Sequence, residues 1–385
     1  MYRLGRGCRY EHYLKYMRTC LNRKTVKTAA LVCLLLLVVA TLFVRLLYVQ
    51  SYLDHVQSIL NNGRKYEHNI YRRIHYIRRP HYISSDVFEG CKYSCYFTES
   101  DTLEDDTDNL IVIWRDLPDV APPKPRNQIW VYHSMEPPPL HGKSYASWRK
   151  LFNWTISYRR DSDIYSPYGI IAKKKNIDKN ITSQNLSINW DAKTKDVVWF
   201  VSNCKSFSMR YEYAVALNKT VDVDMFGQCG DQKCDEKWPI CAKKLQSIYR
   251  YYLSFENSLC RDYITEKSFK IYEILFDAIP IVRNGAFLNH YLPPGSYIST
   301  KDFHSVEYLG NFLKVLENTK KTPSTYFNWR KHYVARAMIQ SNETFCELCR
   351  RSHTDKKYQK VYNDFETWLR GGEDNSFCLP VADIQ

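Results

Sequence analysis

The sequence contains no glycine-rich phosphate loop of the P-loop type and no recognisable nucleic-acid-binding module. Its net charge of +14 would otherwise suggest a nucleic-acid partner. Part of that charge lies in residues 1–28, however, and four more arginines follow within residues 72–79. We interpret these clusters as signals for membrane topology and as contacts with anionic surfaces, so no nucleic-acid partner is expected.

Acidic residues are almost missing from residues 1–28, where Glu11 is the one acid against eight Lys and Arg. An apolar run follows over residues 29–49, and at a rise of 1.5 Å per residue it reaches roughly 30 Å, enough to cross a bilayer once. Arg45 interrupts this run, but a long side chain near a helix end can reach the interface. No small-residue cleavage site follows, so a signal anchor is favoured over a cleaved signal peptide. The positive flank predicts a type II protein with a cytosolic N-terminus.

The rest of the chain has the composition of a folded protein, with 44% hydrophobic and 15% aromatic residues, and its 385 residues allow two domains. Residues without an apolar period and rich in Tyr, His and Arg follow the span; they suit a stem, and a dimerising helical neck is the alternative. The expected divisions are a cytosolic tail 1–28, a transmembrane signal anchor 29–49, a stem 50–90, an N-terminal domain 91–190 and a C-terminal domain with a disulfide-bonded tail, 191–385.

Ten of the thirteen cysteines lie beyond the apolar run. An even number in an oxidising lumen predicts disulfides, although the sequence leaves their pairing open. The spacings of Cys91 with Cys95 and of Cys346 with Cys349 also fit half-sites for zinc, but we favour disulfides in a lumenal protein. Five N-glycosylation sequons indicate the same compartment. They begin at Asn153, Asn180, Asn185, Asn218 and Asn342.

Apolar strands alternate with helical segments over most of the remaining sequence. Strands are expected over residues 110–114, 128–132, 221–226, 249–255, 279–282 and 296–299, with another beginning at Asp196, and helices over 209–218, 265–277 and 306–316. This alternation predicts an α/β protein with doubly wound sheets. Pro280 argues against an ordinary central position for the strand at 279–282.

The most informative stretch is residues 255–267, which place polar and charged groups between a strand and a helix. The N–H groups and positive dipole end of such a helix can hold an anion, with help from Lys267. Candidate binding residues are Asn257, Tyr263, Thr265, Glu266 and Lys267. Each alone is more often a turn, core or first-turn residue, and their joint occurrence on one turn favours a site.

Two more places carry charged candidates. Glu136 follows the strand at 128–132 and is itself followed by three prolines, which fix it on a rigid loop at a strand end. From the residues alone, a solvated loop carboxylate is the favoured interpretation of Glu136. Asp161 and Asp163 could chelate a metal ion with a diphosphate, or pair with Arg159 and Arg160. We favour the pairing. Arg210 begins a helix, where pairing with Glu212 is the structural alternative to ligand binding.

Residues 255–267 resemble the donor-binding signature of the α1,3-fucosyltransferases of glycosyltransferase family 10, a pattern close to FENSxCxDYITEK. Residues 157–169 resemble the family's SYRRDSD and PYG segment, and the resemblance extends over residues 110–349. The cysteine-rich loop at 227–241 is more similar to the branch that modifies the N-glycan core than to the Lewis-type branch.

The resemblance implies a GT-B architecture, with two Rossmann-like domains facing a cleft, an acceptor-side domain first and a GDP-fucose-binding domain second. It also implies inverting transfer of L-fucose from GDP-β-L-fucose to the 3-OH of N-acetylglucosamine (GlcNAc) on glycoprotein glycans in the Golgi membrane. Glu136 is then the general base, and the donor-binding residues are Arg210, Asn257, Tyr263, Thr265, Glu266 and Lys267. No metal cofactor is required, although stimulation by Mn²⁺ is left open. A homodimer through the stem or the transmembrane segment is compatible with the sequence.

Two alternatives remain at the level of sequence. One is a glycosyltransferase of another class that binds a metal through Asp161 and Asp163, and the other is a non-catalytic, membrane-anchored glycan-binding protein. The acceptor also stays open, because the GlcNAc of an N-glycan core and that of a Lewis-type or LacdiNAc antenna present the same hydroxyl.

Overall fold

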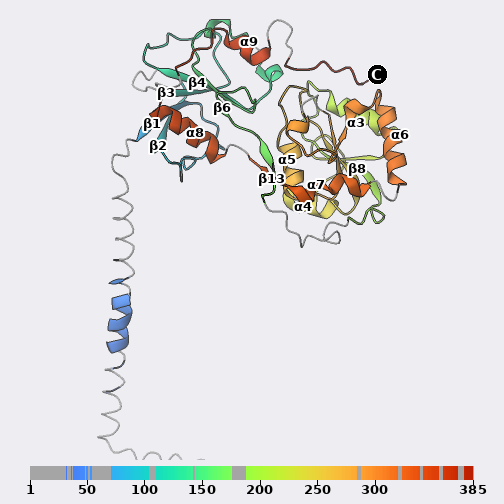
Figure 1. The fold of residues 1–385 in the computed structure, drawn as a ribbon, viewed down its shortest axis with the longest axis horizontal. Helices are drawn as coiled ribbons and strands as arrows, with labels where there is room; N and C mark the ends of the chain where they lie inside the picture. The colour runs from blue at the N-terminus through green and yellow to red at the C-terminus, as the bar shows by residue number, and fades with distance from the viewer. Residues whose placement is uncertain are drawn as a thin grey trace, which may run out of the picture. The chain divides into compact units, whose positions relative to one another are not determined.

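The computed structural model divides the chain into two units, residues 1–69 and 70–385. It describes residues 71–103, 110–141, 144–175, 188–283, 288–319, 323–338, 341–354, 359–371 and 377–384, together with parts of 32–53 (Figure 1). The expected cytosolic tail, much of the expected anchor and the first part of the expected stem lie outside the described residues. A search of the residues that are described finds no helix with the length and apolarity needed to cross a membrane.

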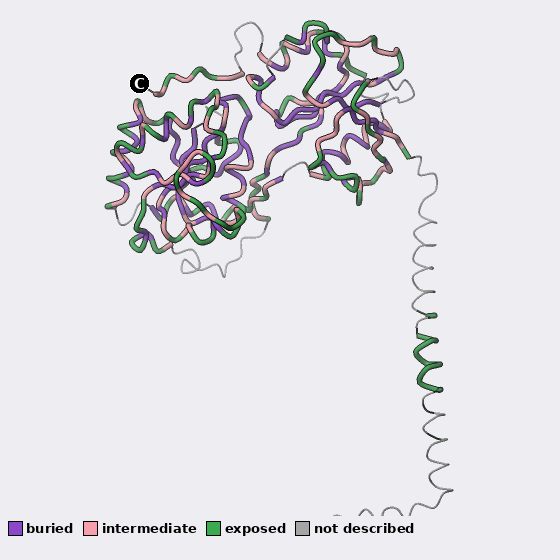
Figure 2. The backbone as a smooth tube through the Cα atoms, turned by 180° about the vertical axis from the view of Figure 1, so that it is seen from behind, coloured by how far each residue is buried: buried purple, intermediate pink, exposed green. Residues whose placement is uncertain are grey.

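The first sheet of the second unit has six parallel strands in the order β2-β1-β3-β4-β5-β6. Its strands are β1 (Arg72–Ile77), β2 (Cys95–Ser100), β3 (Leu110–Trp114), β4 (Ile129–Ser134), β5 (Trp154–Ser157) and β6 (Ile164–Tyr165). The inner strands are buried on both faces, as parallel sheets covered on both sides require (Figure 2). The strands expected from the apolar runs at 110–114 and 128–132 are therefore confirmed.

The expected stem, residues 50–90, is corrected by β1. This strand lies between β2 and β3 and buries Ile74 and Tyr76 in the core. The polar side chains that suggested a stem are satisfied inside the sheet: the His75 ring is hydrogen-bonded to the hydroxyls of Thr98 and Ser100 at 2.9 Å each. The first domain thus begins well before residue 91.

The second sheet has five parallel strands in the order β12-β11-β10-β8-β9. They are β8 (Lys195–Phe200), β9 (Val223–Phe226), β10 (Tyr249–Ser254), β11 (Ile279–Val282) and β12 (Ile298–Ser299). Helices α3 (Arg210–Leu217) and α6 (Val306–Glu317) share one hydrophobic core with the sheet, and α4 (Trp238–Leu245), α5 (Glu266–Glu273) and α7 (Trp329–His332) share another (Figure 1). The α/β class with parallel sheets is confirmed.

Pro280 lies in an internal strand, contrary to the expectation from its missing N–H. Strand β11 pairs with β10 on one side and with β12 on the other. The two-residue strand β12 pairs only with Ile281 and Val282, so it begins beyond Pro280 and needs no donor from it.

A small antiparallel sheet joins β7 (Gly169–Lys173) to β13 (Tyr333–Ala337) and packs against α5. Gly169 has to be a glycine, because a Cβ atom there would lie 2.1 Å from the Phe269 ring. This close approach fixes the segment around Tyr168 against the helix that follows residues 255–265.

The C-terminal part of the chain returns to the first sheet, which corrects the expected boundaries of the second domain. Helix α8 (Asn342–His353) buries Phe345 and Leu348 in the core beneath β1 and β3, and α9 (Phe365–Arg370) buries Phe365 against the opposite core of that sheet (Figure 1). Residues 377–384 then bind the second sheet again, where Asp383 forms a salt bridge with Arg283.

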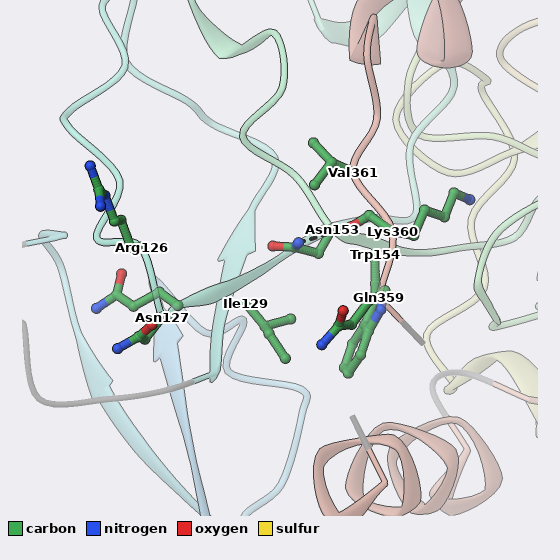
Figure 3. A pocket seen from close by; sticks show the side chains of 9 residues that line it. Arg126, Asn127, Ile129, Asn153, Trp154, Gln359, Lys360 and Val361 are labelled. Atoms are coloured by element: carbon green, nitrogen blue, oxygen red, sulfur yellow. Dashed lines mark hydrogen bonds between the residues drawn. The ribbon is translucent and has the colours of Figure 1, made fainter. Parts of the chain in front are cut away.

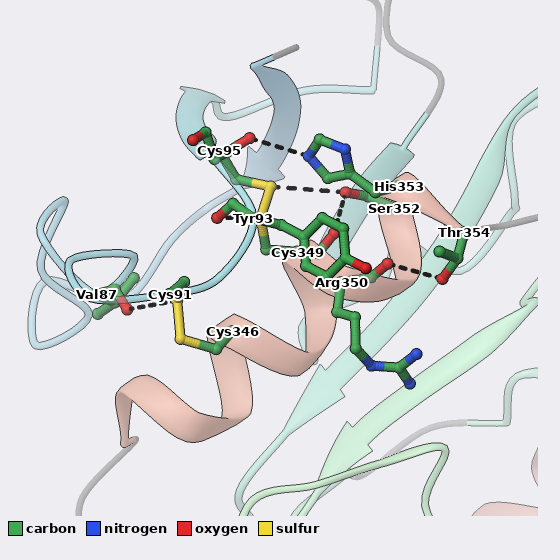
Figure 4. Close-up of a disulfide and its surroundings, with 11 residues drawn as sticks. Val87, Cys91, Tyr93, Cys95, Cys346, Cys349, Arg350, Ser352, His353 and Thr354 are labelled. Atoms are coloured by element: carbon green, nitrogen blue, oxygen red, sulfur yellow. Dashed lines mark hydrogen bonds between the residues drawn. A yellow bond between two sulfur atoms is a disulfide. The ribbon is translucent and has the colours of Figure 1, made fainter. Parts of the chain in front are cut away.

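Five disulfides join the ten cysteines of the second unit, which confirms disulfides over zinc. The pairs are Cys91–Cys346, Cys95–Cys349, Cys204–Cys229, Cys234–Cys241 and Cys260–Cys378. The first pair holds α8 to the segment before β2, and the second holds α8 to the first residue of β2 (Figure 4). Of the expected sequons, Asn218 and Asn342 are exposed, whereas Asn180 and Asn185 lie outside the described residues.

We predict that the two disulfides on α8 act redundantly. Either bond alone closes a chain segment of about 255 residues, so the second adds only a small ring to the first. Replacing both cysteine pairs by alanine should cost about 2–4 kcal/mol of unfolding free energy, and replacing one pair much less. Urea unfolding without reductant measures this, with Cys234 and Cys241 replaced by alanine as the short-loop control. Equal losses for one pair and for both would contradict it.

Candidate active site

The polar stretch at residues 255–265 connects β10 to α5, as the sequence predicts. Thr265 is the N-cap of α5, and its hydroxyl accepts a hydrogen bond from the Lys267 backbone N–H at 3.4 Å. The other N–H groups in the first turn of α5 and the positive end of its dipole remain available to a ligand near the end of β10. A negatively charged ligand is favoured at this position.

Glu256 organises this turn, and the sequence analysis did not single it out. Its carboxylate is 2% exposed and accepts hydrogen bonds from the Thr265 N–H and the Thr265 hydroxyl, each at 2.7 Å. The Lys267 ammonium lies 3.3 Å from the same carboxylate and donates to the Thr265 hydroxyl at 2.8 Å. The sequence signal that could have identified Glu256 is a carboxylate placed two residues after an aromatic-rich strand.

The charges on this turn are strongly coupled. Burial by itself lowers the pKa of Lys267, but the carboxylates of Glu256 and Glu266 outweigh it and leave that pKa raised. Burial raises the pKa of Glu256, which the charge of Lys267 offsets only in part. Burial also raises the pKa of Glu266, but the charge of Lys267 outweighs this effect, so the pKa of Glu266 is lowered. Lys267 is therefore a permanent cation, and its side chain keeps 26% of its surface exposed.

A pocket of 260 Å³ brings residues of both domains together. Its lining residues are Tyr82, Met135, Glu136, Tyr168, Asn257, Tyr263, Glu266 and Lys267. The candidates Glu136, Asn257, Tyr263, Glu266 and Lys267 thus share one pocket. The Oδ1 atom of Asn257 is buried and has no hydrogen-bond partner in the structure, so an acceptor is left for a ligand donor.

The backbone around Glu136 is fixed by its neighbours on the loop after β4. The Ser134 hydroxyl accepts a hydrogen bond from the Glu136 N–H at 3.1 Å, and His141 Nε2 lies 3.1 Å from the Glu136 carbonyl oxygen. That oxygen only accepts, so Nε2 carries the proton and His141 Nδ1 accepts from the Tyr132 hydroxyl at 3.0 Å. Within the described residues, the Glu136 carboxylate itself makes no hydrogen bond or salt bridge.

Arg210 and Thr265 do not line the pocket. Arg210 is 5% exposed and donates to the carbonyl oxygens of Phe255 at 2.8 Å and Asn203 at 3.1 Å. The alternative of a pair with Glu212 is therefore wrong, since the guanidinium joins the loop after β8 to the end of β10. Its Nε atom is buried without a hydrogen-bond partner.

Asp161 and Asp163 are engaged by separate partners. Arg159 binds Asp161 through two hydrogen bonds, at 2.9 and 2.5 Å. Asp163 accepts from the Thr155 N–H at 3.0 Å and from the Lys360 ammonium at 3.0 Å. The favoured pairing is thus confirmed for Asp161, and for Asp163 the cation is Lys360 rather than the expected arginine.

A larger, polar pocket of 590 Å³ lies at the other end of the first sheet (Figure 3). It is lined by residues at the starts of β4 and β5, among them Ile129 and Trp154, whereas Glu136 follows the end of β4. None of the residues singled out as catalytic or donor-binding lies in it. Asn153 in this pocket binds the Trp130 N–H and the Lys360 carbonyl oxygen through its side chain.

We predict an acid-sensitive site loop. Burial lowers the pKa of His141 from 6.5 to about 4. Between these two pH values, His141 is therefore protonated in the unfolded chain and neutral in the folded chain. The stabilisation by neutral His141 is complete above pH 6.5 and is lost as the pH falls toward 4, at about 1.4 kcal/mol per pH unit. In urea unfolding between pH 7 and 4.5, the free energy of unfolding of His141→Gln should depend less on pH than that of the wild type, by about one proton. The control His304→Gln, at an exposed histidine, should keep the pH dependence of the wild type. An unchanged slope in His141→Gln would show that the ring is not held neutral.

Comparison with known proteins places the chain in a family. The model described as "Glycosyltransferase family 10 (fucosyltransferase) C-term" matches residues 190–368, and the one described as "Fucosyltransferase, N-terminal" matches residues 69–169. The chain is 36% identical to Alpha-(1,3)-fucosyltransferase C of Drosophila melanogaster over 63% of its own length, but spans only 59% of that relative. It is 32% identical to Alpha-(1,3)-fucosyltransferase fut-1 of Caenorhabditis elegans, over 74% of this chain and 67% of that protein.

Among solved structures, one titled as an alpha1,3-fucosyltransferase with GDP-fucose aligns with 77% of this chain and 94% of its own, at a TM-score of 0.48 and 14% identity. We draw no conclusion about the architecture from this alignment, and the family assignment rests on the sequence matches. This chain belongs to glycosyltransferase family 10, the fucosyltransferase family.

Proposed function

We propose that this protein transfers L-fucose from GDP-β-L-fucose to the 3-OH of a GlcNAc in glycoprotein glycans, with inversion to an α-fucoside. The observation that carries the proposal is the shared pocket of Glu136 and Lys267, which is lined by a permanent cation and by a carboxylate that has no protein partner among the residues the structure describes. The names of the relatives, α-(1,3)-fucosyltransferases, support the sugar and the linkage. The two parallel sheets suit the GT-B architecture expected from the resemblance.

Glu136 acts as the general base in this proposal. As the acceptor oxygen bonds to C1 of fucose, its proton passes to the Glu136 carboxylate and the bond from C1 to the phosphate oxygen breaks. The electron pair of that bond leaves with GDP. Proton removal requires hydrogen-bond reach, and a carboxylate that has no competing protein partner in the described structure is free to provide it.

The negative charge that develops on GDP is stabilised by Lys267 and the start of α5. Arg210 adds its positive charge from behind the turn, where it is buried and holds the Phe255 carbonyl oxygen. Thr265 and the buried carboxylate of Glu256 hold the Lys267 ammonium in place. Asn257, Tyr263 and Glu266 bind the ribose and base, for which the unpaired Asn257 oxygen provides an acceptor. These cations and the helix dipole perform the task that a metal ion has in other glycosyltransferases, so the mechanism requires none.

We further propose the location and the acceptor class given by the sequence. The basic N-terminal flank and the apolar run favour a single-pass type II protein of the Golgi membrane with a lumenal catalytic part. Five disulfides suit that oxidising lumen. The acceptor is the GlcNAc of an N-glycan core or of an antenna, and a panel of both acceptors with linkage analysis of the products would distinguish them.

The donor assignment predicts that Lys267→Ala weakens GDP binding by about 10- to 100-fold, because one charge-assisted contact to phosphate is lost. Isothermal titration with GDP measures this, and Lys243→Ala, an exposed lysine on α4, is the matched control. Since Lys267→Ala leaves the buried Glu256 carboxylate without its cation, the variant Lys267→Met with Glu256→Gln tests the same contact without that charge. GDP affinity that survived both variants and vanished in EDTA would favour the metal-binding alternative at Asp161 and Asp163.

The base assignment predicts that Glu136→Gln binds GDP normally and transfers fucose about 10²- to 10⁴-fold more slowly. Glutamine keeps the size of the side chain but cannot take the proton. Turnover with GDP-fucose and a GlcNAc-bearing acceptor is the measurement, and Glu89→Gln, an exposed carboxylate of the first domain, is the control. Near-normal turnover in Glu136→Gln would overturn the assignment, and wild-type protein that bound GDP-fucose but fucosylated no acceptor would indicate a glycan-binding protein instead.

A further inference from the structure

A second hollow opens at the same edge of the first sheet as Glu136. It has a volume of 520 Å³ and is formed where β1, β2 and β3 end. We call it the distal hollow. The side chains that matter for its chemistry are Arg78, Asp101, Leu103, Asp116 and Val120.

The distal hollow lies beside the proposed base. Strands β3 and β4 are neighbours, and Asp116 and Glu136 each follow the last residue of their strand by two positions. Adjacent strands are about 4.8 Å apart, so the chain segments that carry Asp116 and Glu136 leave the same edge of the sheet side by side. Tyr82, which lines the 260 Å³ pocket, packs edge-on against Trp114, with ring centroids 6.3 Å apart. Trp114 is the last residue of β3, two positions before Asp116 of the distal hollow.

The lining of the distal hollow combines polar groups with apolar surface. The side chains of Asp101 and Asp116 are exposed, and Arg78 is held by a hydrogen bond from its guanidinium to the Asp116 carbonyl oxygen. Arg78 has a φ of 54°, in the left-handed region that non-glycine residues rarely occupy outside functional or strained sites. Val120, which is 77% exposed, and the partly buried Leu103 contribute apolar surface to the same hollow.

We propose that the distal hollow binds the sugars of the acceptor glycan next to the GlcNAc that receives fucose. The inference rests on the proposed function and adds the part of the site that recognises an extended, neutral oligosaccharide. Sugar hydroxyls donate to the carboxylates of Asp101 and Asp116 and accept from Arg78, while the C–H faces of the rings pack on Leu103 and Val120. The hollow, together with the 260 Å³ pocket, then selects acceptors by the sugars beyond the reacting one.

The test compares two acceptors on the full-length protein: methyl β-N-acetylglucosaminide and a neutral N-glycan that carries the same GlcNAc. Asp101→Asn combined with Asp116→Asn should lower kcat/KM for the N-glycan at least about tenfold more than for the monosaccharide, mostly through KM, because two charge-assisted hydrogen bonds weaken. Val120→Trp, which fills the hollow without removing a polar group, should shift the ratio in the same direction. Asp191→Asn, an exposed carboxylate of the second domain, is the matched control and should leave the ratio unchanged.

The outcomes separate this inference from the proposed function. An active enzyme whose ratio of the two kcat/KM values stays the same in both hollow variants would overturn the distal hollow as an acceptor site and leave the fucosyl transfer intact. Equal losses for both acceptors would assign Asp101 and Asp116 to the structure of the sheet edge and also overturn it. Wild-type protein that fucosylates neither acceptor would overturn the proposed function together with this inference.

Discussion

A buried carboxylate has to be neutralised and hydrogen-bonded, and after β10 this requirement shapes the whole turn at residues 255–265. Glu256 meets it by accepting from the N–H and hydroxyl of Thr265 and by attracting the Lys267 ammonium. The same contacts cap α5, so the helix start and the cation are set by one interaction. Lys267 keeps its charge and a quarter of its surface exposed, which is what a group that meets a diphosphate needs.

The first sheet contributes a second polar arrangement, on the other side of the same pocket. There His141, neutral because it is buried, holds the carbonyl oxygen of Glu136 and leaves the Glu136 carboxylate without a protein partner among the described residues. Both arrangements use buried polar groups to fix the backbone and leave one charged side chain available to the pocket. The contact of Gly169 with Phe269 holds β7 to α5, and the disulfide between Cys260 and Cys378 holds residues 377–384 to the turn before α5.

Much of the fold followed from local patterns. The apolar runs of β3, β4 and β10 and the helical spacing of α3 and α5 appear in the structure close to where they were expected. The prediction of elements and domain boundaries failed for segments whose own sequence is polar and whose burial depends on distant partners. Strand β1 carries Arg and His, and its place between β2 and β3 depends on partners more than twenty residues away. Helices α8 and α9 follow the second sheet in the chain but pack on the first, a choice made by long-range burial and by two disulfides.

The sequence by itself determined the chemistry of the turn between β10 and α5, because the buried carboxylate, the cap, the cation and the helix start lie within residues 255–267 and depend on local hydrogen bonds and the helix dipole. It also determined that Glu136 stands on a rigid loop at a strand end. Only the tertiary structure decided that Glu136 and Lys267 line one pocket, that Lys360 binds Asp163, and that a second hollow opens at the sheet edge that carries Glu136. The first two relations join segments more than a hundred residues apart, and the third depends on the pairing of β1, β2 and β3, so tertiary packing sets all three rather than any local preference.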